Sequence, residues 1–262
     1  MHWPELIVYN NRMTKIHHLN CVSIQSPFGA KAIGHCLLLE DRNGLALVDT
    51  GIGLLETKNP KERLGQDLID AVGFQFDERQ TAIHQIGALG FDPQQIRYAI
   101  LTHMDPDHIG GLADFPAMEP HVSNEEYENF ISGNKRYLPV QLSHMRSIRT
   151  YTSSSNRWFG LEARPVDFLF ESEIYLVPLF GHTFGHCGVA IKQDEGWIFH
   201  IGDAYYLRAE TEVADHPISQ LAIRRADNNE LRLESLSHIK RLMHEHPEIE
   251  IFGYHDAAEF PG

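Results

Sequence analysis

The chain has 262 residues, of which 42% are apolar, and a formal net charge of −14 with histidine counted as neutral. This length allows one large domain or two small ones, and the apolar content suffices for a buried core. The negative charge argues against a nucleic-acid partner or an anionic membrane surface, because both are bound through basic patches.

Cysteine usage and the amino terminus give expectations about the compartment. Cys21, Cys36 and Cys187 are odd in number and lack CxxC spacing, so they indicate no disulfide framework. The first residues, Met-His-Trp-Pro-Glu, lack the basic and apolar regions of a signal peptide, and no run of about 18 apolar residues occurs. We therefore expect a soluble, cytoplasmic protein, and we expect residues 1–262 to form a single domain because no linker divides them.

The first quarter of the chain predicts strands followed by a surface excursion. Residues 6–9 and 16–25 are expected to be strands. The apolar runs at 36–40 and 45–49 predict a hairpin, because the turn between them ends in Asn-Gly. Residues 54–77 are charged and show no clear periodicity, so we expect them to cross the surface, close to the site.

The next elements lead into the central part of the chain. Residues 78–89 carry apolar side chains at helical spacing and stop at Gly90, which predicts a helix. Residues 98–101 read as a strand, and residues 123–131 begin with a Ser-x-x-Glu capping box that predicts a helix start. Residues 132–165 have no readable period and are either a helical insertion covering the site or a surface loop.

The remaining part regains β character and contains one long helix. Strands are expected at 166–170, 174–178, 188–192, 197–201 and 249–254. Residues 230–246 form a strong amphipathic pattern that ends at Pro247. Strands alternating with helices in this way predict an α/β layer structure.

Four metal-capable side chains directly follow the strand at 98–101. His103, Asp105, Asp107 and His108 lie within six residues, and Pro106 among them excludes the interior of a helix. An α/β sheet presents a site by delivering side chains to a loop at the carboxyl end of a strand. A polar loop that happens to be rich in histidine and aspartate is the alternative, and it is disfavoured by matching motifs elsewhere in the chain.

Further polar motifs follow other expected strands. These are Asp49-Thr-Gly51, Gly181-His182-Thr-Phe-Gly-His186, Gly202-Asp203 and His255-Asp256. Asp49 could orient a metal ligand or only cap a turn. His186 could likewise support the site or be satisfied by nearby backbone.

With these motifs in this order, over roughly residues 35–256, the sequence resembles the metallo-β-lactamase superfamily. The resemblance implies an αββα sandwich with two sheets back to back, helices outside, and a dinuclear metal site at one edge. One ion would be held by His103, Asp105 and His182, and the other by Asp107, His108 and His255, with Asp203 bridging the two. Asp49 and His186 would orient these ligands.

The resemblance also implies a mechanism. Two divalent ions can share and deprotonate one water, and the resulting metal-bound hydroxide would attack a small ester or lactone carbonyl. Within the superfamily the nearest group is that of the N-acyl homoserine lactonases, whose bridging aspartate is followed three residues later by a tyrosine, here Tyr206. We expect Asp107 and Tyr206 to act in catalysis, with Tyr206 donating to the developing oxyanion. A core tyrosine is the alternative for this position.

One residue departs from the family pattern. Most hydrolases of the family carry His-x-His-x-Asp-His, whereas this chain has His-x-Asp-x-Asp-His with Asp105 in place of the second histidine. Zinc is the expected metal by family, but a harder, anionic ligand favours manganese or iron. The flavodiiron branch places a glutamate there, so an iron-dependent redox enzyme acting on a thiol or oxygen species is the alternative function. A binding protein without catalysis would require the loss of further ligands.

Two expectations concern the surroundings of the site. His144 lies in the unreadable segment 132–165, and long unpatterned segments in compact domains are often functional, so we expect His144 to approach the substrate pocket. The expected partner is a small-molecule substrate, and a homodimer is the assembly that we consider.

Overall fold

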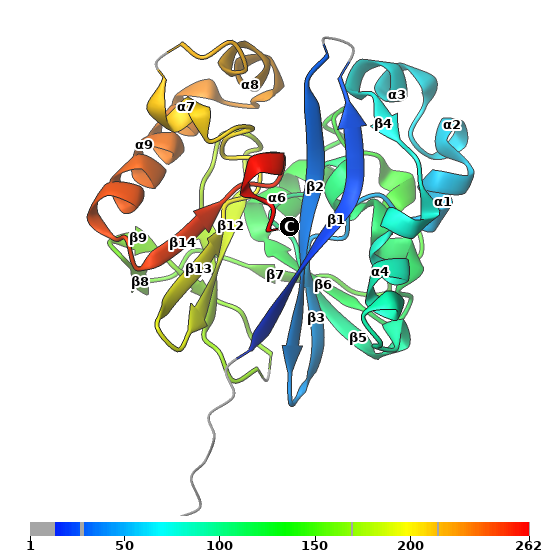
Figure 1. The fold of residues 1–262 in the computed structure, drawn as a ribbon, viewed down its shortest axis with the longest axis horizontal. Helices are drawn as coiled ribbons and strands as arrows, with labels where there is room; N and C mark the ends of the chain where they lie inside the picture. The colour runs from blue at the N-terminus through cyan, green and yellow to red at the C-terminus, as the bar shows by residue number, and fades with distance from the viewer. Residues whose placement is uncertain (1–13, 27–28, 169, 214, 262) are drawn as a thin grey trace, which may run out of the picture.

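The computed structural model describes residues 14–26, 29–168, 170–213 and 215–261, and within them two sheets pack face to face between outer helices (Figure 1). This is the αββα sandwich that the resemblance to the superfamily implies. The expected strand at residues 6–9 lies outside the described residues.

The first sheet has seven strands in the order β4-β1-β2-β3-β5-β6-β7. Their bounds are β1 (Lys15–Gln25), β2 (Lys31–Asp41), β3 (Gly44–Val48), β4 (Phe74–Gln75), β5 (Ile96–Ile100), β6 (Glu119–Ser123) and β7 (Arg149–Tyr151). The strands from β4 to β3 pair antiparallel, and those from β3 to β7 pair parallel. The parallel strands β3, β5 and β6 therefore end at one edge of the sheet, where their following loops meet.

The second sheet has five strands in the order β10-β11-β12-β13-β14. Their bounds are β10 (Arg164–Pro165), β11 (Ile174–Pro178), β12 (Cys187–Gln193), β13 (Gly196–His200) and β14 (Ile249–Phe252), and a separate ribbon joins β8 (Arg157–Trp158) to β9 (Leu161–Glu162). The last pair, β13 and β14, is parallel, so both strands end at the same edge.

The helices flank the two sheets on their outer sides (Figure 1). They are α1 (Leu54–Lys58), α2 (Pro60–Arg63), α3 (Gln66–Val72), α4 (Ala82–Ala88), α5 (Pro106–Ile109), α6 (Asn124–Ile131), α7 (Ala209–Glu212), α8 (Ser219–Arg225) and α9 (Asn229–Glu245). Short 3₁₀ turns are η1 (Glu78–Gln80), η2 (Pro93–Gln95), η3 (Gly110–Asp114), η4 (Pro139–Leu142) and η5 (Ala257–Glu259). No helix of the described residues has the length and apolar character needed to cross a bilayer.

The strand β2 shows why the sheets lie back to back. Its residues alternate between two apolar clusters: Leu37 and Leu39 pack into the layer between the sheets, while Cys36 and Leu38 pack under the outer helices. A strand with both faces buried reads as a continuous apolar run rather than an alternating one. The inter-sheet cluster takes residues from both sheets, which supports our proposal that the chain forms one domain.

Several elements differ from the sequence predictions. The surface excursion expected at 54–77 consists of α1, α2, α3 and β4, which are too short to show a hydrophobic period. The helix expected at 78–89 divides into η1 and α4. Residues 166–168 belong to no strand, and residue 169 lies outside the described residues, so the strand predicted at 166–170 is wrong over its described part.

The segment 132–165 is not a helical insertion. It contains the 3₁₀ turn η4 and the strands from β7 to β10, which are two or three residues long. Strands this short present too few alternating positions to be recognised in a sequence. The segment nevertheless reaches the candidate site, through a residue described below.

Candidate metal centre

The loop after β5 is extended at Asp105 and becomes helical after it. The polar side chains before and after this point therefore leave the backbone in different directions. Asp105 is extended (φ −61°, ψ 151°) and precedes α5, whose first residue is Pro106. A proline is tolerated there because the first helical N–H has no partner within the helix. Asp107 and His108 then lie in the helical turn, while His103 and Asp105 precede it.

Close backbone packing fixes this loop against the end of β3. Gly51 forms an isolated bridge with Ile109, and the amide of Gly111 donates to the Gly51 carbonyl at 2.9 Å. A Cβ added at Gly111 would lie 2.3 Å from the Thr50 carbonyl oxygen. Glycine is therefore required at position 111 for the loop to approach β3.

The remaining ligand candidates come from the ends of other strands. His182 lies between β11 and β12, Asp203 follows β13, and His255 follows β14. The structure brings them together with the residues of the α5 loop into three overlapping groups, in each of which the ligand atoms lie within 4.8 Å of one another. The groups are His103–Asp105–His182, His103–His108–Asp203 and Asp107–His108–His255.

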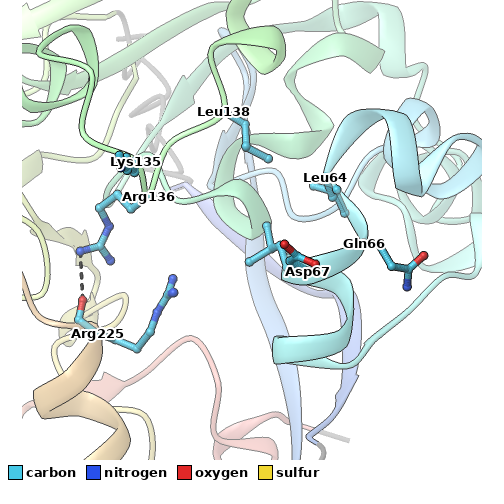
Figure 2. Close-up of a pocket in the computed structure, with 9 residues that line it drawn as sticks. Leu64, Gln66, Asp67, Lys135, Arg136, Leu138 and Arg225 are labelled. Atoms are coloured by element: carbon cyan, nitrogen blue, oxygen red, sulfur yellow. Dashed lines mark hydrogen bonds between the residues drawn. The ribbon is translucent and has the colours of Figure 1, made fainter.

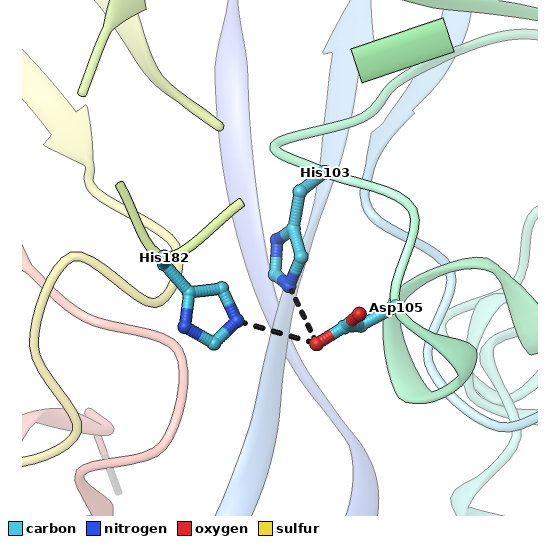
Figure 3. A group of neighbouring side chains, drawn as sticks. All are labelled: His103, Asp105 and His182. Carbon is cyan, nitrogen blue, oxygen red and sulfur yellow. Dashed lines mark hydrogen bonds and ion pairs between the residues drawn. The ribbon is translucent and has the colours of Figure 1, made fainter. Parts of the chain in front are cut away.

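The first group is nearly closed to solvent. The Asp105 Oδ2 atom lies 3.2 Å from His182 Nε2 and 3.5 Å from His103 Nε2 (Figure 3). All three side chains are buried. The edge of a tetrahedron of ligands around a small divalent ion has about this length, because metal–ligand distances are about 2.0–2.2 Å.

Asp203 lies between the two halves of the cluster. Its Oδ2 atom is 3.2 Å from His255 Nε2 and 3.5 Å from His182 Nε2, and its Oδ1 atom is 3.4 Å from His108 Nε2. Asp107 Oδ2 lies 3.7 Å from His255 Nε2, on the more open side. One carboxylate thus faces imidazoles of both halves, which is the arrangement required of a bridging ligand.

Buried polar atoms without partners show that the donors fit divalent cations. His103 Nε2, His108 Nε2 and Asp203 Oδ1 are buried and have no hydrogen-bond partner among the described residues. Buried polar groups are normally satisfied, so such a convergence calls for an explanation. A cation bound by these atoms supplies it, and imidazole nitrogens with carboxylate oxygens suit zinc and other first-row divalent metals.

Hydrogen bonds at the opposite ring atoms turn the Nε2 atoms toward the centre. His108 Nδ1 lies 2.9 Å from Asp49 Oδ2, and His255 Nδ1 lies 2.9 Å from the Ile33 carbonyl. With Nδ1–H as donor, the lone pair of Nε2 is free for a metal.

Asp49 is a supporting carboxylate and not a ligand candidate in these groups. Its Oδ1 accepts from the Thr102 amide at 2.9 Å, and its Oδ2 accepts from the Thr102 hydroxyl at 2.7 Å as well as facing His108. Asp49 has a φ of 54°, which is unusual for a residue with a Cβ. Through its hydrogen bonds to Thr102 and His108, Asp49 connects the end of β3 to the segment between β5 and α5.

His186 faces away from the proposed metal positions. Its Nδ1 lies 2.9 Å from the Leu179 carbonyl, and its Nε2 accepts from the Asp203 amide at 3.0 Å. Burial lowers the pKa of His186 to about 3, which keeps the ring neutral and able to accept. His186 thus positions the backbone of Asp203.

The two neighbouring tyrosines have different surroundings. The Tyr206 ring lies 5.8 Å from the His182 ring and 5.4 Å from the His255 ring, so it borders both halves of the cluster. Burial raises the pKa of the Tyr206 phenol, which therefore remains a proton donor at neutral pH. The Tyr205 hydroxyl instead donates to Glu259 at 2.8 Å and does not serve the site.

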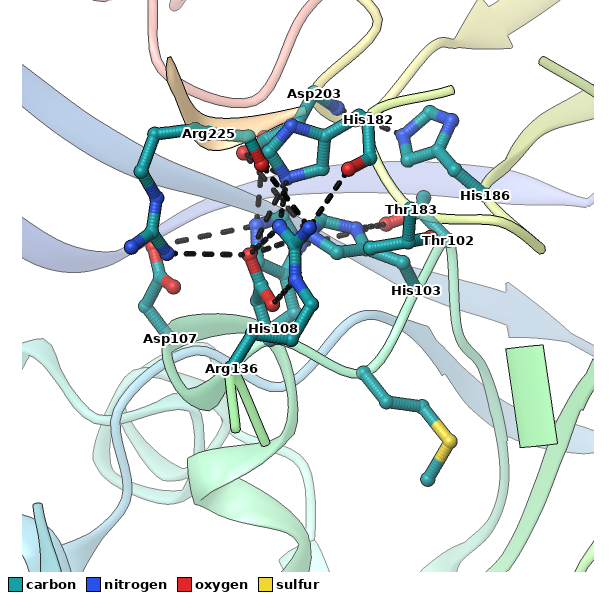
Figure 4. Close-up of polar contacts among 12 residues, drawn as sticks. Thr102, His103, Asp107, His108, Arg136, His182, Thr183, His186, Asp203 and Arg225 are labelled. Carbon is teal, nitrogen blue, oxygen red and sulfur yellow. Dashed lines mark hydrogen bonds and ion pairs between the residues drawn. The ribbon is translucent and has the colours of Figure 1, made fainter. Parts of the chain in front are cut away.

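The sequence did not reveal Arg136, whose side chain lies among the ligand candidates (Figure 4) and binds Asp105. Its Nε donates to Asp105 Oδ1 and its Nη2 to Asp105 Oδ2, both at 2.7 Å, in a bidentate pair. Its Nη1 also donates to the His182 carbonyl and to Asp227. No local pattern marks this arginine, and the only signal was the extra carboxylate at position 105.

This pair changes the charge of the first half of the site. Burial opposes ionisation of Asp105, but the Arg136 guanidinium overrides it and holds the pKa of the carboxyl well below its ordinary value. The Asp105–Arg136 pair is neutral overall, as is the histidine that most of the family carries. An extra anionic ligand makes a metal a weaker Lewis acid. Because Arg136 neutralises Asp105, this effect is smaller here.

Glu126 is a second residue whose role at the site the sequence did not predict, since it was expected only as part of a helix-capping box. Ser123 caps α6 as expected and accepts from the Glu126 amide at 3.1 Å. The Glu126 carboxylate, however, accepts from the Met104 amide at 2.8 Å and contacts the Thr183 hydroxyl at 2.5 Å. It therefore links the loop carrying His103 to the loop carrying His182, and burial raises its pKa to about 7.

His144 remains a prediction as a residue of the substrate pocket. Its surroundings are the Leu112 backbone, Arg63 and Glu56, near α1 and α2. It does not belong to the lining of the cavity beside the metal centre. The segment 132–165 contacts the ligand candidates through Arg136, whose guanidinium binds Asp105.

Comparison with known proteins identifies the family of this chain. The family described as the Metallo-beta-lactamase superfamily matches residues 31–242. A probable metallo-hydrolase of Mycobacterium tuberculosis is 36% identical over 201 residues, which cover 74% of this chain and 63% of that protein. The N-acyl homoserine lactonase AttM of Rhizobium johnstonii is 30% identical over 179 residues, covering 65% of this chain and 64% of the lactonase. The chain thus matches less than two thirds of the length of these relatives.

Solved structures agree on the fold. An N-acyl homoserine lactone hydrolase with the product N-hexanoyl-L-homoserine at its catalytic metal centre superposes with a TM-score of 0.72. The match covers 95% of this chain and 96% of the hydrolase at 19% identity, so it concerns the fold alone. Together with the match over residues 31–242, these findings show that the chain belongs to the metallo-β-lactamase superfamily.

Proposed function

We propose that this protein is a metal-dependent hydrolase with a dinuclear centre that cleaves a small ester or lactone. The observation that carries the proposal is the convergence of three buried, unpartnered ligand atoms on His103, His108 and Asp203. The relatives named as a metallo-hydrolase and as an N-acyl homoserine lactonase support the reaction class.

The ligands divide into two sets that share Asp203. His103, Asp105 and His182 would hold one cation, while Asp107, His108 and His255 would hold the other. Divalent ions in such a pair polarise a carbonyl oxygen and lower the pKa of a water between them.

The protein's own residues orient the reactants and supply a proton. Tyr206 borders both ligand sets, and its hydroxyl makes no hydrogen bond to another described residue, so it can donate to the carbonyl oxygen as negative charge develops there. Asp107 is the more exposed of the ligand carboxylates, at 14%, and lies where a substrate would enter. The buried histidines exclude bulk water behind the reacting carbonyl.

Zinc is the metal that we propose, with manganese or iron as competitors at the set that contains Asp105. The carboxylate favours harder ions, whereas its pairing with Arg136 reduces the charge that the metal experiences. These two effects oppose each other, so metal content must be measured.

The test combines metal analysis with hydrolysis of lactone, ester, thioester and phosphoester substrates. We expect metal-dependent cleavage of a lactone or ester, and Tyr206→Phe should lower kcat by about 10²-fold or somewhat less with unchanged metal content. Tyr205→Phe is the matched control, since its hydroxyl binds Glu259, and it should retain activity.

Two outcomes would contradict the proposal. Equal rates for the wild type and Tyr206→Phe would leave Tyr206 as a packing residue. Iron content with oxygen consumption and no hydrolysis of any substrate would favour the redox alternative on the same fold.

A further inference from the structure

A cavity of about 420 Å³ adjoins the metal centre on the side of Arg136. One wall is formed by residues 64–68, which follow α2 and include the start of α3, and the opposite wall by Lys135, Arg136, Leu138 and Arg225 (Figure 2). This volume lies within the range of small-molecule sites. The leucines of both walls provide apolar surface beside the charged groups.

The lining is cationic although the chain is strongly acidic. Lys135, Arg136 and Arg225 face a single carboxylate, Asp67, in a protein of net charge −14. A cleft lined by one sign of charge concentrates ligands of the opposite sign. The cavity is therefore suited to an anion that the rest of the surface repels.

Arg136 cannot be the group that binds this anion, because its donors are already used. They serve both oxygens of Asp105, the carbonyls of His182 and Arg225, and Asp227. Its side chain is only 8% exposed. Arg136 is thus a fixed part of the wall.

Arg225 has the opposite properties. Its side chain is 38% exposed, and its contact with a carboxylate is an ion pair at 3.7 Å to Asp105, which Arg136 already neutralises. No hydrogen bond to another described residue occupies its guanidinium. Arg225 is therefore a second arginine beside Asp105, whose charge is already balanced by Arg136.

The backbone of Arg225 is held in place while its side-chain tip is left available. It is the last residue of α8, and its carbonyl accepts from Arg136 Nη1 at 3.0 Å. The chain after it is fastened by the Asp227 amide, which donates to the His182 carbonyl at 3.0 Å. Because the backbone of Arg225 is already fixed, less conformational entropy is lost when its guanidinium binds a ligand.

Arg225 also lies near the groups that would surround a reacting carbonyl. Its Nη2 atom lies 3.7 Å from Asp105 Oδ2, and the residue also lines the cavity. The guanidinium is thus placed between the cavity and the open side of the metal centre.

We infer that Arg225, assisted by Lys135, binds an oxyanion on the substrate, so that the protein acts on small esters or lactones that carry a carboxylate or phosphate group. The inference rests on the proposed hydrolase function and names its substrate class. The anionic group lies in the cavity against Arg225, and the scissile carbonyl lies between Tyr206 and the ligand cluster.

The first experiment measures binding without turnover. Calorimetry on the metal-loaded full chain compares pentanoate with glutarate and 4-phosphonobutyrate, which add a second anionic group. We expect the two-headed anions to bind about tenfold more tightly, as a charge-assisted hydrogen bond provides. The better of the two identifies carboxylate or phosphate as the recognised group.

Variants assign this preference to one side chain. Arg225→Gln should abolish the advantage of the two-headed anions, and Arg225→Lys should retain part of it. Arg224→Gln is the matched control, because it removes the same charge from the exposed neighbouring position of α8. Equal binding of all anions by the wild type, or an unchanged preference in Arg225→Gln, would overturn the inference.

The second experiment compares ethyl pentanoate with monoethyl glutarate and ethyl 4-phosphonobutyrate as substrates. Arg225→Gln should lower kcat/KM for the anionic esters about tenfold more than for the neutral ester, and the difference should arise through KM. An equal fall in kcat for all three would place Arg225 at the reacting carbonyl and overturn the inference, with the hydrolase function intact. No hydrolysis of any ester, together with the Arg225-dependent binding preference, would refute the function and leave the anion site standing.

Discussion

The two halves of the metal centre are held by different kinds of support. The half with His108 and His255 is fixed by acceptors, namely the Asp49 carboxylate and the Ile33 carbonyl. The half with Asp105 and His182 is fixed by a cation, because Arg136 binds both. An imidazole ligand is thus oriented by a hydrogen-bond acceptor, and a carboxylate ligand by a cationic donor.

The same difference appears in the protonation of the histidines. Burial lowers the pKa of His108 and His255, but Asp203 overrides it and raises both. Burial dominates at His103 and His182, and their pKa values are lowered. In the metal-free protein, protons therefore compete with a metal more strongly at the first pair than at the second.

The largest expected effect comes from removing the residue that the two halves share. Asp203→Ala deletes the carboxylate that faces His108, His182 and His255, so it should reduce binding of the second ion well below one equivalent and abolish nearly all activity. Elemental analysis and hydrolysis rates check this. Full occupancy by two metals in the variant would remove Asp203 from the centre.

The next comparison breaks the support of each half separately. Asp49→Asn should lower metal affinity by about 10–100-fold, because an amide cannot accept from both Thr102 and His108. Glu126→Gln should cost less, because its amide can still accept from Met104 and donate to Thr183. Competition titrations with a chelator measure both variants, and equal losses would contradict the expected order of Asp49 and Glu126.

A third experiment replaces the carboxylate ligand of one half by an imidazole, the ligand type that dominates the other half. Asp105→His should shift occupancy from manganese or iron toward zinc, since it replaces an oxygen donor by nitrogen. It also leaves Arg136 buried without its main partner, so the double variant Asp105→His/Arg136→Gln should be the more stable of the two.

Elemental analysis of proteins grown in the same medium, together with thermal unfolding, provides the measurement. Two full zinc equivalents in the wild type, unchanged in both variants, would show that position 105 does not select the metal.

The smallest effect concerns pH. Because the pKa values of His108 and His255 are raised, their half should lose metal affinity as the pH falls through those raised values, since protons then compete with the metal for these imidazoles. The half with His103 and His182 should change less, since their lowered pKa values leave no proton to displace. Stepwise metal titrations at several pH values would show one dependent and one nearly independent event, and identical dependence of both would contradict this assignment.

The sequence by itself determined the elements that carry the ligands. Each proposed ligand follows an apolar strand, and strand and motif signals are local, so they can be read without a structure. The hairpin of β2 and β3, the capping of α6 by Ser123 and the long helix α9 were predicted for the same reason.

Only the tertiary structure decided what surrounds those ligands. Arg136 lies 31 positions from Asp105, and Arg225 is farther still, so no local period or spacing links either one to the motif. The sequence instead singled out His144, because an unpatterned segment gives no information about which of its residues faces the site. Burial turned Asp105 from an extra negative charge into half of a neutral pair, since a carboxylate taken out of water is kept ionised only by a cation brought to it through folding.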